Sequence, residues 1–365
     1  MKILTRCNET KQKIFIYSKN RDLLLDGKRS TLFYERGNTM EQERKSIYEL
    51  LEADIMNSDL SEADKAAKLS RLLQVRSKQV NIMLVGATGS GKSSTINALF
   101  DMNVAKVGIG VDPETTTISN FVLDNLVIWD SPGLGDGVER DKRITRDIIA
   151  KLNEIGEDGK PIIDLVVVIM DSSSKDLGTT YNLINKVLVP CLGSEAVKRI
   201  IIGLNQADVA MKGNHWLKEE NKPDEVLNKY LKRKVASVQA RVKDGTGLDI
   251  TPICYCAGYS EEGKEQCKPY NLTKLLHRIV QIIPREKRLA LADKINTQKE
   301  NWEYDDEEDD YGSETTKDFV DVVFDYIEVA SEVGGKILGV PGKILGGVAG
   351  AVIGTITSIF KSIFG

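Results

Sequence analysis

Residues 80–100 read VNIMLVGATGSGKSSTINALF, and this stretch decides the fold. An apolar run of strand length ends at Val85, a loop with three glycines follows from Gly86 to Gly91, and a helix-like segment begins at Lys92. The loop matches GxxxxGKS, the pattern of a phosphate-binding P-loop, and it has the strand before it and the helix after it that the motif requires.

The chemistry of this loop is specific. Its glycines allow the backbone to wrap closely around phosphates, so that successive N–H groups and the helix N-terminus face the anion. The Lys92 ammonium is expected at the β- and γ-phosphates, and the Ser93 hydroxyl at a magnesium ion. The pattern therefore predicts nucleotide contacts from Gly86, Ala87, Thr88, Gly89, Ser90, Gly91, Lys92, Ser93 and Ser94.

Two later motifs select the nucleotide. Asp130-Ser-Pro-Gly133 follows the apolar run NLVIW and gives DxxG, in which Asp130 is expected to hold Mg2+ through water and the Gly133 amide to contact a γ-phosphate. Asn205-Gln206-Ala-Asp208 follows IIIGL and gives NxxD. The Asp208 carboxylate can accept hydrogen bonds from guanine N1–H and the 2-amino group. Adenine lacks that donor pair and would leave the carboxylate unpaired.

Further contacts are expected from two other segments. Cys256 and Ala257 end the last predicted strand, and the Ala257 amide is expected to meet guanine O6. The polar segment 112–117, DPETTT, offers hydroxyls where a switch loop must reach Mg2+ and the γ-phosphate. We favour Thr115 as the threonine that reaches Mg2+, because it leaves the spacing between the loop and the next strand least compressed, and Thr116 is the close alternative. If the segment has no function, it is a threonine-rich start of a strand.

Short apolar runs alternate with helix-length polar segments over residues 79–285, which predicts an α/β domain with a mostly parallel sheet covered on both faces. The predicted strands are Val80–Val85, Phe121–Leu123, Leu126–Trp129, Leu165–Met170, Ile200–Leu204 and Thr251–Cys256, and the short link at Asp124-Asn125 implies one antiparallel hairpin. The predicted helices are Lys92–Phe100, Arg140–Asn153, Leu177–Leu188, Pro223–Val242 and Thr273–Ile283.

This set of motifs resembles the translation-factor class of GTPases and, within it, the Era-like group. The stretches GATGSGKSSTINALFDMNVAKVG and WDSPGLGDG look closer still to the YfjP/YeeP-type bacterial GTPases. The resemblance implies a Ras-like G domain of six strands, GTP and GDP with Mg2+, and a nucleotide-driven switch. Three positions depart from the usual pattern: Gln206 replaces the lysine of NKxD, Gly258 replaces the lysine of SAK, and Gly89 replaces an asparagine associated with potassium activation.

Leu134 follows DxxG, where Ras-like enzymes have a water-orienting glutamine. A leucine cannot position water, so hydrolysis of GTP to GDP is expected to depend on Lys92, Thr115 or Thr116, Gly133 and Mg2+. This predicts slow intrinsic turnover that a homodimer, a higher oligomer or another partner accelerates. The alternative is a GTP-dependent interaction module with negligible hydrolysis.

Composition narrows the class of protein. The net charge is −4 and no long segment is strongly basic, which argues against nucleic acid as an obligatory partner. Five cysteines without CxxC spacing indicate a reducing compartment, with neither a disulfide framework nor a zinc site. The charged N-terminus does not resemble a secretory signal, so we expect a cytoplasmic protein, with peripheral contact to the inner membrane as the alternative that the C-terminal tail raises.

The flanking segments are less informative. Residues 1–39 form an extension with weak periodicity, and 40–78 form a helical segment with Ile47, Leu50, Leu51 and Ile55 on one face. A helix is expected over 286–300, and residues 301–317, which contain the acidic run Asp305–Asp310, are expected to be a solvated linker.

Residues 318–365 combine an amphipathic helix with a glycine-rich apolar tail. Gly342, Gly346, Gly350 and Gly354 recur every four residues, a spacing that allows close helix–helix approach. The uncharged run Ile344–Phe360 would span about 25 Å as a helix, against ~30 Å for a bilayer core. Three interpretations stay open for residues 334–365: packing against this chain or another copy, membrane association, and disorder. If the tail associates with a membrane, the protein would be a membrane-active effector whose tail is controlled by the G domain.

Overall fold

The computed structural model describes residues 2–8, 11–18, 21–25, 45–100, 118–259, 267–325 and 348–365. Internal contacts divide the chain into two units, Met1–Lys45 and Ser46–Gly365. The first unit contains three antiparallel strands in the order β1-β2-β3, namely β1 (Lys2–Asn8), β2 (Lys11–Ser18) and β3 (Arg21–Leu25). The extension over 1–39 thus has defined strands, which its weak periodicity did not indicate, because strand pairing uses backbone groups that every residue carries.

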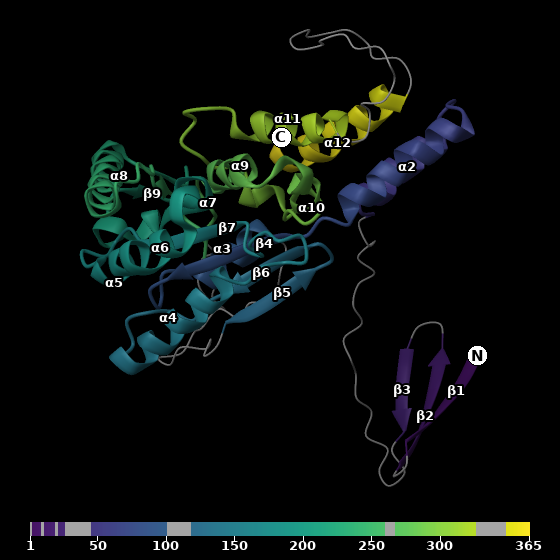
Figure 1. The fold of residues 1–365 in the computed structure, drawn as a ribbon, viewed down its shortest axis with the longest axis horizontal. Coiled ribbons are helices and arrows are strands. Elements are labelled where there is room, and N and C mark those ends of the chain that lie inside the picture. Colours follow the sequence, from purple (N-terminus) through teal and green to yellow (C-terminus); the bar gives the residue numbers. More distant parts are fainter. Residues whose placement is uncertain are drawn as a thin grey trace. The chain divides into compact units, whose positions relative to one another are not determined.

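The second unit is built on a six-stranded sheet with the order β11-β8-β7-β4-β6-β5 (Figure 1). Only β5 and β6 pair antiparallel, and their hairpin turns at Asp124 and Asn125 as the sequence predicts. The other neighbours pair in parallel. The strands are β4 (Val80–Gly86), β5 (Ser119–Leu123), β6 (Leu126–Asp130), β7 (Leu165–Asp171), β8 (Ile200–Asn205) and β11 (Ile253–Cys254).

Alternate side chains of the sheet enter two separate cores. In β4, Ile82 and Leu84 belong to one apolar cluster, and Met83 and Val85 belong to the other. Both faces are therefore buried, as a parallel sheet requires. The helices that follow the strands are α3 (Lys92–Leu99), α4 (Val138–Leu152), α5 (Gly178–Leu183), α6 (Val189–Leu192), α7 (Ala196–Arg199), α8 (Glu225–Thr246) and α9 (Leu272–Ile282).

A short two-stranded ribbon, β9 (Trp216–Leu217) and β10 (Lys222–Pro223), precedes α8. The predicted helix Leu177–Leu188 is present but continues from α5 into a π-helical turn over Ile184–Leu188. The sheet, its single antiparallel edge and the alternation of strands and helices confirm the predicted fold class.

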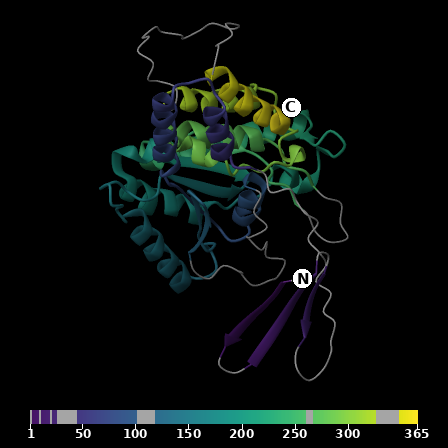
Figure 2. The same cartoon turned by 90° about the vertical axis from the view of Figure 1, so that its right-hand side faces the viewer.

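Two helices precede the sheet: α1 (Ile47–Met56) and α2 (Glu62–Arg76). Ser46 caps α1, and the Asp293 carboxylate accepts hydrogen bonds from Ser46 Oγ at 2.8 Å and from the Ile47 N–H at 2.5 Å. The predicted inner face of α1 is largely confirmed, except that Tyr48 is buried in addition and Leu50 is only half-buried. Figure 2 shows α1 and α2 in blue on the side of the sheet that also carries α12 in yellow.

The helix predicted over 286–300 is shorter than expected. A 3-10 turn at Arg285–Lys287 leads into α10 (Arg288–Ala292), and a second 3-10 turn covers Lys299–Asn301. The helix ends because Asp293 is engaged with the start of α1, and because the Asn296 side chain accepts a hydrogen bond from the Gln298 N–H at 2.8 Å. Such a local side-chain acceptor competes with helical pairing.

The segment 301–317, predicted as a solvated linker, is solvated only in part. Glu307–Asp310 are exposed, but the residues before them contact the domain and a helix begins at Tyr311. Trp302 is buried, and the Asn271 side chain accepts a hydrogen bond from the Asp306 N–H at 2.7 Å. Lys274 pairs with Asp306 at 2.6 Å and with Glu308 at 2.8 Å. An acidic run indicates a solvated surface only when nothing basic faces it, and the pattern along the chain does not show this basic partner.

The last two elements close the second unit. The predicted amphipathic pattern has apolar residues at 319, 322, 323, 326, 327, 330 and 333. Helix α11 (Tyr311–Val323) buries the first three of these, Phe319, Val322 and Val323. The remainder of that pattern lies outside the described residues.

Helix α12 (Val348–Phe364) packs beside α11 and α1. Phe360 stacks on Phe319 with ring centroids 4.8 Å apart, and Phe364 meets Trp302 edge-on at 5.6 Å. Packing against the chain's own helices is therefore the reading that the described part of the tail supports.

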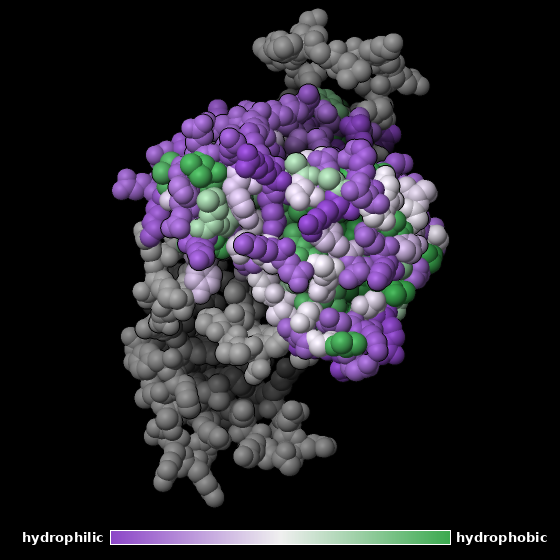
Figure 3. All heavy atoms as spheres, turned by 90° about the vertical axis from the view of Figure 1, so that its left-hand side faces the viewer, coloured by the Kyte–Doolittle hydropathy of each residue, from purple (hydrophilic) through white to green (hydrophobic). Residues whose placement is uncertain are grey.

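Gly354 of the predicted glycine stripe does not make this contact, since a Cβ there would touch nothing within 4 Å. Gly342 and Gly346 lie outside the described residues. The close approach is instead at Gly312, where a Cβ would lie 2.9 Å from the Cβ of Phe364. Within the described ranges, no helix combines the length and apolar character needed to cross a bilayer. On the face shown in Figure 3, hydrophobic residues form small separate groups among hydrophilic ones.

Candidate nucleotide-binding site

The P-loop lies between the end of β4 and the start of α3, at the carboxyl edge of the parallel strands. Gly91 precedes α3 with a φ of 88°, and a Cβ there would lie 2.1 Å from Asn205 Nδ2. Both the left-handed backbone and the lack of space require glycine at this position. The predicted loop is thus present with the backbone that phosphate binding needs.

Lys92 is folded back on its own loop. Its ammonium donates hydrogen bonds to the carbonyl oxygens of Ala87 at 3.1 Å and Gly86 at 3.4 Å, and the residue is 8% exposed. Burial lowers the pKa of Lys92, and the nearby carboxylates of Asp130 and Asp136 partly oppose this effect. A buried cation that is paired only with carbonyl oxygens is poised to accept a polyphosphate.

Ser93 and Asp130, the two described residues that the sequence predicts as magnesium ligands, contact each other. Ser93 Oγ donates to Asp130 Oδ2 at 3.1 Å, and the other carboxylate oxygen, Asp130 Oδ1, is buried without a hydrogen-bond partner among the described residues. Burial raises the pKa of Asp130, while Lys92 and Ser93 act in the opposite direction. A hydroxyl beside a carboxylate with an unsatisfied oxygen is a donor set that suits Mg2+.

The segment after DxxG is bound to the P-loop by its backbone. Thr88 N–H donates to Leu134 O at 3.0 Å, and Leu134 N–H donates to Gly86 O at 3.2 Å. A Cβ on Gly133 would lie 2.4 Å from Thr88 Cα, so only glycine fits where the two loops cross. The Leu134 side chain is 4% exposed and belongs to the core below the loops. The sequence predicts that Leu134 does not orient water, and its burial adds a structural reason for that prediction.

Asn205 joins the phosphate end of the site to the base end. Its Nδ2 donates to the Ser90 carbonyl at 3.0 Å, and its Oδ1 accepts from the Ala257 N–H at 3.0 Å. The Ala257 amide is therefore engaged by Asn205, and a guanine O6 would have to share or replace that contact, which the sequence did not predict. The arrangement holds three separate loops in one site.

Gln206 and Asp208 complete the base end. Gln206 takes a left-handed φ of 64° and donates from Nε2 to the Gly89 carbonyl at 2.7 Å, so it contacts the P-loop although it is not a lysine. Asp208 lies in the 3-10 helix Ala207–Gly213, and its Oδ2 accepts a hydrogen bond from Cys267 Sγ at 3.4 Å. Cys256 is buried beside it.

Two contacts were missed by sequence reasoning. Thr88 Oγ1 donates to Asp136 at 2.6 Å, and Asp136 pairs with Arg140 at 3.1 Å. Asp136 stands in the loop that follows DxxG, which is the signal that would have drawn attention to it. Cys267 gave no signal, because it lies far from the NxxD motif in the sequence.

The remaining predicted residues divide into two groups. Ser94 is half-buried on the first turn of α3 beside the loop residues named above. Thr115 and Thr116 lie outside the described residues.

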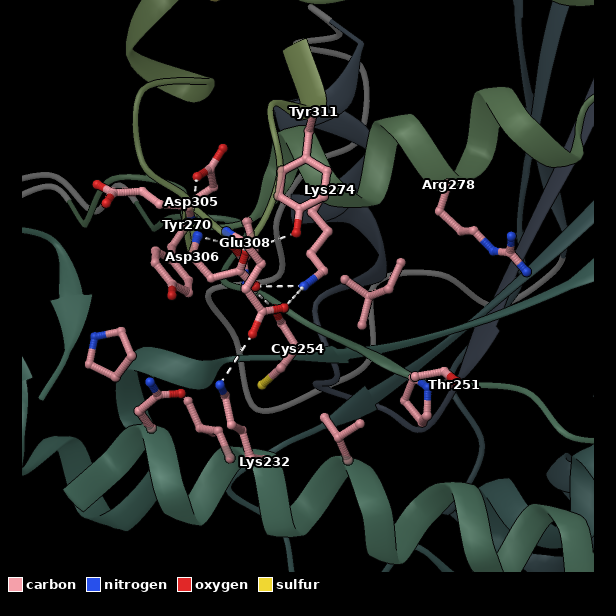
Figure 4. A pocket seen from close by; sticks show the side chains of 18 of the residues that line it. Lys232, Thr251, Cys254, Tyr270, Lys274, Arg278, Asp305, Asp306, Glu308 and Tyr311 are labelled. Carbon is pink, nitrogen blue, oxygen red and sulfur yellow. Dashed lines mark hydrogen bonds and ion pairs between the residues drawn. The ribbon is translucent and has the colours of Figure 1, made fainter. Parts of the chain in front are cut away.

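A cavity of about 890 Å³ lies elsewhere, between α8, α9 and the acidic segment. Figure 4 shows Lys274 at its centre, reaching Asp306 and Glu308, with Lys232 of α8 approaching Glu308 from the other side. The Cys254 thiol faces this cavity, and burial raises its pKa to about 12, so it is protonated and unreactive. The cavity's lining contains none of the P-loop residues.

Sheet order, P-loop geometry and the assembled site define the Ras-like P-loop GTPase fold. The family model that matches is that of the AIG1 family, over residues 80–245, from the start of β4 to the end of α8. The chain is similar to that family over this stretch. A comparison with curated proteins gives no match.

Solved structures with similar folds include three of interest. A probable GTP-binding protein engB is 18% identical, with 56% of this chain and 98% of that chain covered and a TM-score of 0.35. Toc33 from Arabidopsis thaliana, in complex with GDP and Mg2+, is 14% identical, with coverage of 67% and 98% and a TM-score of 0.40. Era from Aquifex aeolicus, bound to GDP and AlF4-, is 14% identical, with coverage of 57% and 57% and a TM-score of 0.36.

Proposed function

We propose that this chain binds GTP and GDP with Mg2+, hydrolyses GTP to GDP, and acts as a nucleotide-dependent switch or assembly regulator. The observation that carries the proposal is the double hydrogen bond of Asn205, which ties the Ser90 carbonyl of the P-loop to the Ala257 amide of the base loop. These two bonds connect the loop that we propose to bind phosphate with the loop that we propose to meet the base. The match to the AIG1 family model over residues 80–245, which include Ser90 and Asn205 but not Ala257, supports this function.

The site residues that the structure describes are each proposed to have a role in nucleotide binding. Lys92 exchanges its two carbonyl partners for phosphate oxygens, which relieves the cost of burying its charge. Ser93 and Asp130 would hold Mg2+, which when bound neutralises developing charge on the phosphates. Asp208 would read the guanine N1–H and 2-amino group, and Gln206 would keep the P-loop close to the base by its bond to Gly89.

Hydrolysis needs a group that orients the attacking water. The Leu134 side chain is in the core and cannot provide it, so intrinsic turnover is slow and a second copy of the chain or another partner accelerates it. The burial of Leu134 also favours one second candidate, an interaction module that binds GTP but hardly hydrolyses it. The closer likeness to YfjP/YeeP-type GTPases and a cytoplasmic location stay predictions.

A single-turnover assay separates the two candidates. Excess protein is mixed with radiolabelled GTP and Mg2+, and phosphate release is followed over a range of protein concentrations. The switch predicts release that speeds up with protein concentration and disappears in Lys92→Ala. No release above the Lys92→Ala control at any concentration would support the interaction module, and fast release at high dilution would contradict acceleration by a partner.

A further inference from the structure

Three soft or anionic ligands converge at the base end of the site. They are the carboxylate of Asp208 and the thiols of Cys256 and Cys267, whose ligand atoms all lie within 4.8 Å of one another. Cys256 is buried, and the other two residues are half-buried, so the cluster is open to solvent on one side. The sequence predicted no zinc site, because the two cysteines lack the spacing of known zinc motifs.

The backbone holds both cysteines in place. Cys256 and Tyr270 exchange hydrogen bonds of 2.9 Å in both directions, and Tyr259 and Cys267 exchange bonds of 2.9 and 2.8 Å. These pairs bring two segments of the chain together across Gly258, which has a φ of 78°. The thiols therefore face Asp208 from a fixed frame and not from the ends of free loops.

One distance in the cluster can be compared with tetrahedral coordination. With Zn–S bonds of about 2.3 Å and Zn–O bonds of about 2.1 Å, ligand atoms are separated by about 3.6–3.8 Å along the edges of the tetrahedron. Cys267 Sγ and Asp208 Oδ2 are 3.4 Å apart, close to such an edge. Three protein ligands leave the fourth position open, and two thiolates select a thiophilic ion over Mg2+.

The electrostatics fit the same conclusion. The neighbouring Cys267, burial and the Asp208 carboxylate all raise the pKa of the Cys256 thiol, because each disfavours a second negative charge. A divalent cation reverses this preference and displaces the thiol protons as it binds. Metal affinity at this cluster is then expected to rise with pH.

We propose that Asp208, Cys256 and Cys267 form a binding site for Zn2+ or a similar thiophilic divalent ion, and that this ion competes with guanine for Asp208. The second half of this proposal rests on the proposed function, because it requires Asp208 to read the base. A chain with the ion bound would be held in a form that does not take up guanine nucleotide.

The test of the site itself uses no nucleotide. The reduced, full-length chain is titrated with Zn2+ against a chromophoric chelator, at two pH values, beside Cys267→Ser and the control Cys191→Ser. Cys191 is a free cysteine of α6 outside the cluster. We expect one tightly bound Zn2+ per chain, an affinity at least tenfold lower in Cys267→Ser, and no change in Cys191→Ser. Equal binding by Cys267→Ser and the unaltered chain, or no tight binding at all, would overturn the site.

The competition is tested with a fluorescent GDP analogue. Cys267 contacts Asp208, and the serine hydroxyl of Cys267→Ser can donate to that carboxylate in place of the thiol. The loss of analogue binding on adding Zn2+ is therefore measured for each chain relative to its own binding without Zn2+. Zn2+ also binds to the phosphates of the analogue, and this effect is the same for both chains. A larger loss of analogue binding in the unaltered chain than in Cys267→Ser therefore supports competition at Asp208. Equal losses would overturn it. Failure of the analogue to bind either metal-free chain would instead contradict the proposed function, and the Zn2+ titration would stand independently.

Discussion

Ser93 Oγ lies 3.1 Å from Asp130 Oδ2, so the two residues assigned to Mg2+ already contact each other across the P-loop and the end of β6. The Asp130 carboxylate is 2% exposed, and its second oxygen has no partner among the described residues. The site therefore carries a desolvated charge that costs stability until a cation is bound.

This relationship predicts the effect of Asp130→Asn. Burial raises the pKa of Asp130 above its ordinary 3.8, so the folded state holds this proton more tightly than the unfolded state. Through this group, stability falls as pH rises from 3.8 through the raised pKa. Without nucleotide, Asp130→Asn should raise the midpoint of thermal unfolding at pH 7, and it should raise this midpoint by less near pH 4. A gain independent of pH would contradict this assignment.

With Mg2+ and GTP present, the unaltered chain should gain stability, and Asp130→Asn should lose this gain.

Leu134→Gln should not restore a water-orienting residue. The side chain is buried in the core, where an amide without partners costs about 1–3 kcal/mol. We expect lower stability in urea unfolding and no increase in single-turnover hydrolysis. Leu134→Met is the matched control, with a loss below about 1.5 kcal/mol. Faster hydrolysis by the glutamine variant at unchanged stability would show that this position faces the nucleotide.

Phe360→Ala tests the packing of the C-terminal helix. The ring is fully buried and stacks on Phe319 of α11. We expect a loss of about 3–5 kcal/mol in free energy of unfolding. The exposed Ser362 of the same helix provides the control, and Ser362→Ala should change the free energy by less than about 0.5 kcal/mol. If Phe360→Ala left stability unchanged and the intact chain floated with liposomes, α12 would have a membrane role instead of a packing role.

Lys274→Met tests the attachment of the acidic segment. Lys274 contacts both Asp306 and Glu308 and is 25% exposed at its side chain. Its loss should cost about 1 kcal/mol, with a smaller effect in high salt. Lys232 contacts only Glu308, at 3.2 Å, from a side chain that is 67% exposed, so Lys232→Met should have little effect. Equal effects of the two substitutions would show that Lys274 does not hold the segment.

The parts of the fold that local patterns determine could be predicted from the sequence. Glycines, Lys92 and strand-end motifs act through backbone geometry that is encoded within a few residues, so the P-loop, the sheet and the hairpin at Asp124 were all predicted. Contacts between distant segments were not. The sequence predicts a linker at the acidic run because Lys274, its basic partner, lies on α9, 32 residues before Asp306.

The same limit applies to the site. Asp208 could be assigned from NxxD, but nothing in the sequence placed Cys267 against it. The predicted use of the Ala257 amide likewise failed to anticipate its bond to Asn205, since hydrogen bonds between separate loops depend on how the strands are aligned in the sheet.

The central claim is that one site grips a polyphosphate and reads guanine, and calorimetry with Mg2+ tests it most directly. GTP should bind the unaltered chain with one site per molecule, and ATP should bind at least about 100-fold more weakly. Asp208→Ala should reduce this preference, and Lys92→Ala should abolish binding of both nucleotides. ATP binding as tightly as GTP, or the absence of binding by either nucleotide, would contradict the account.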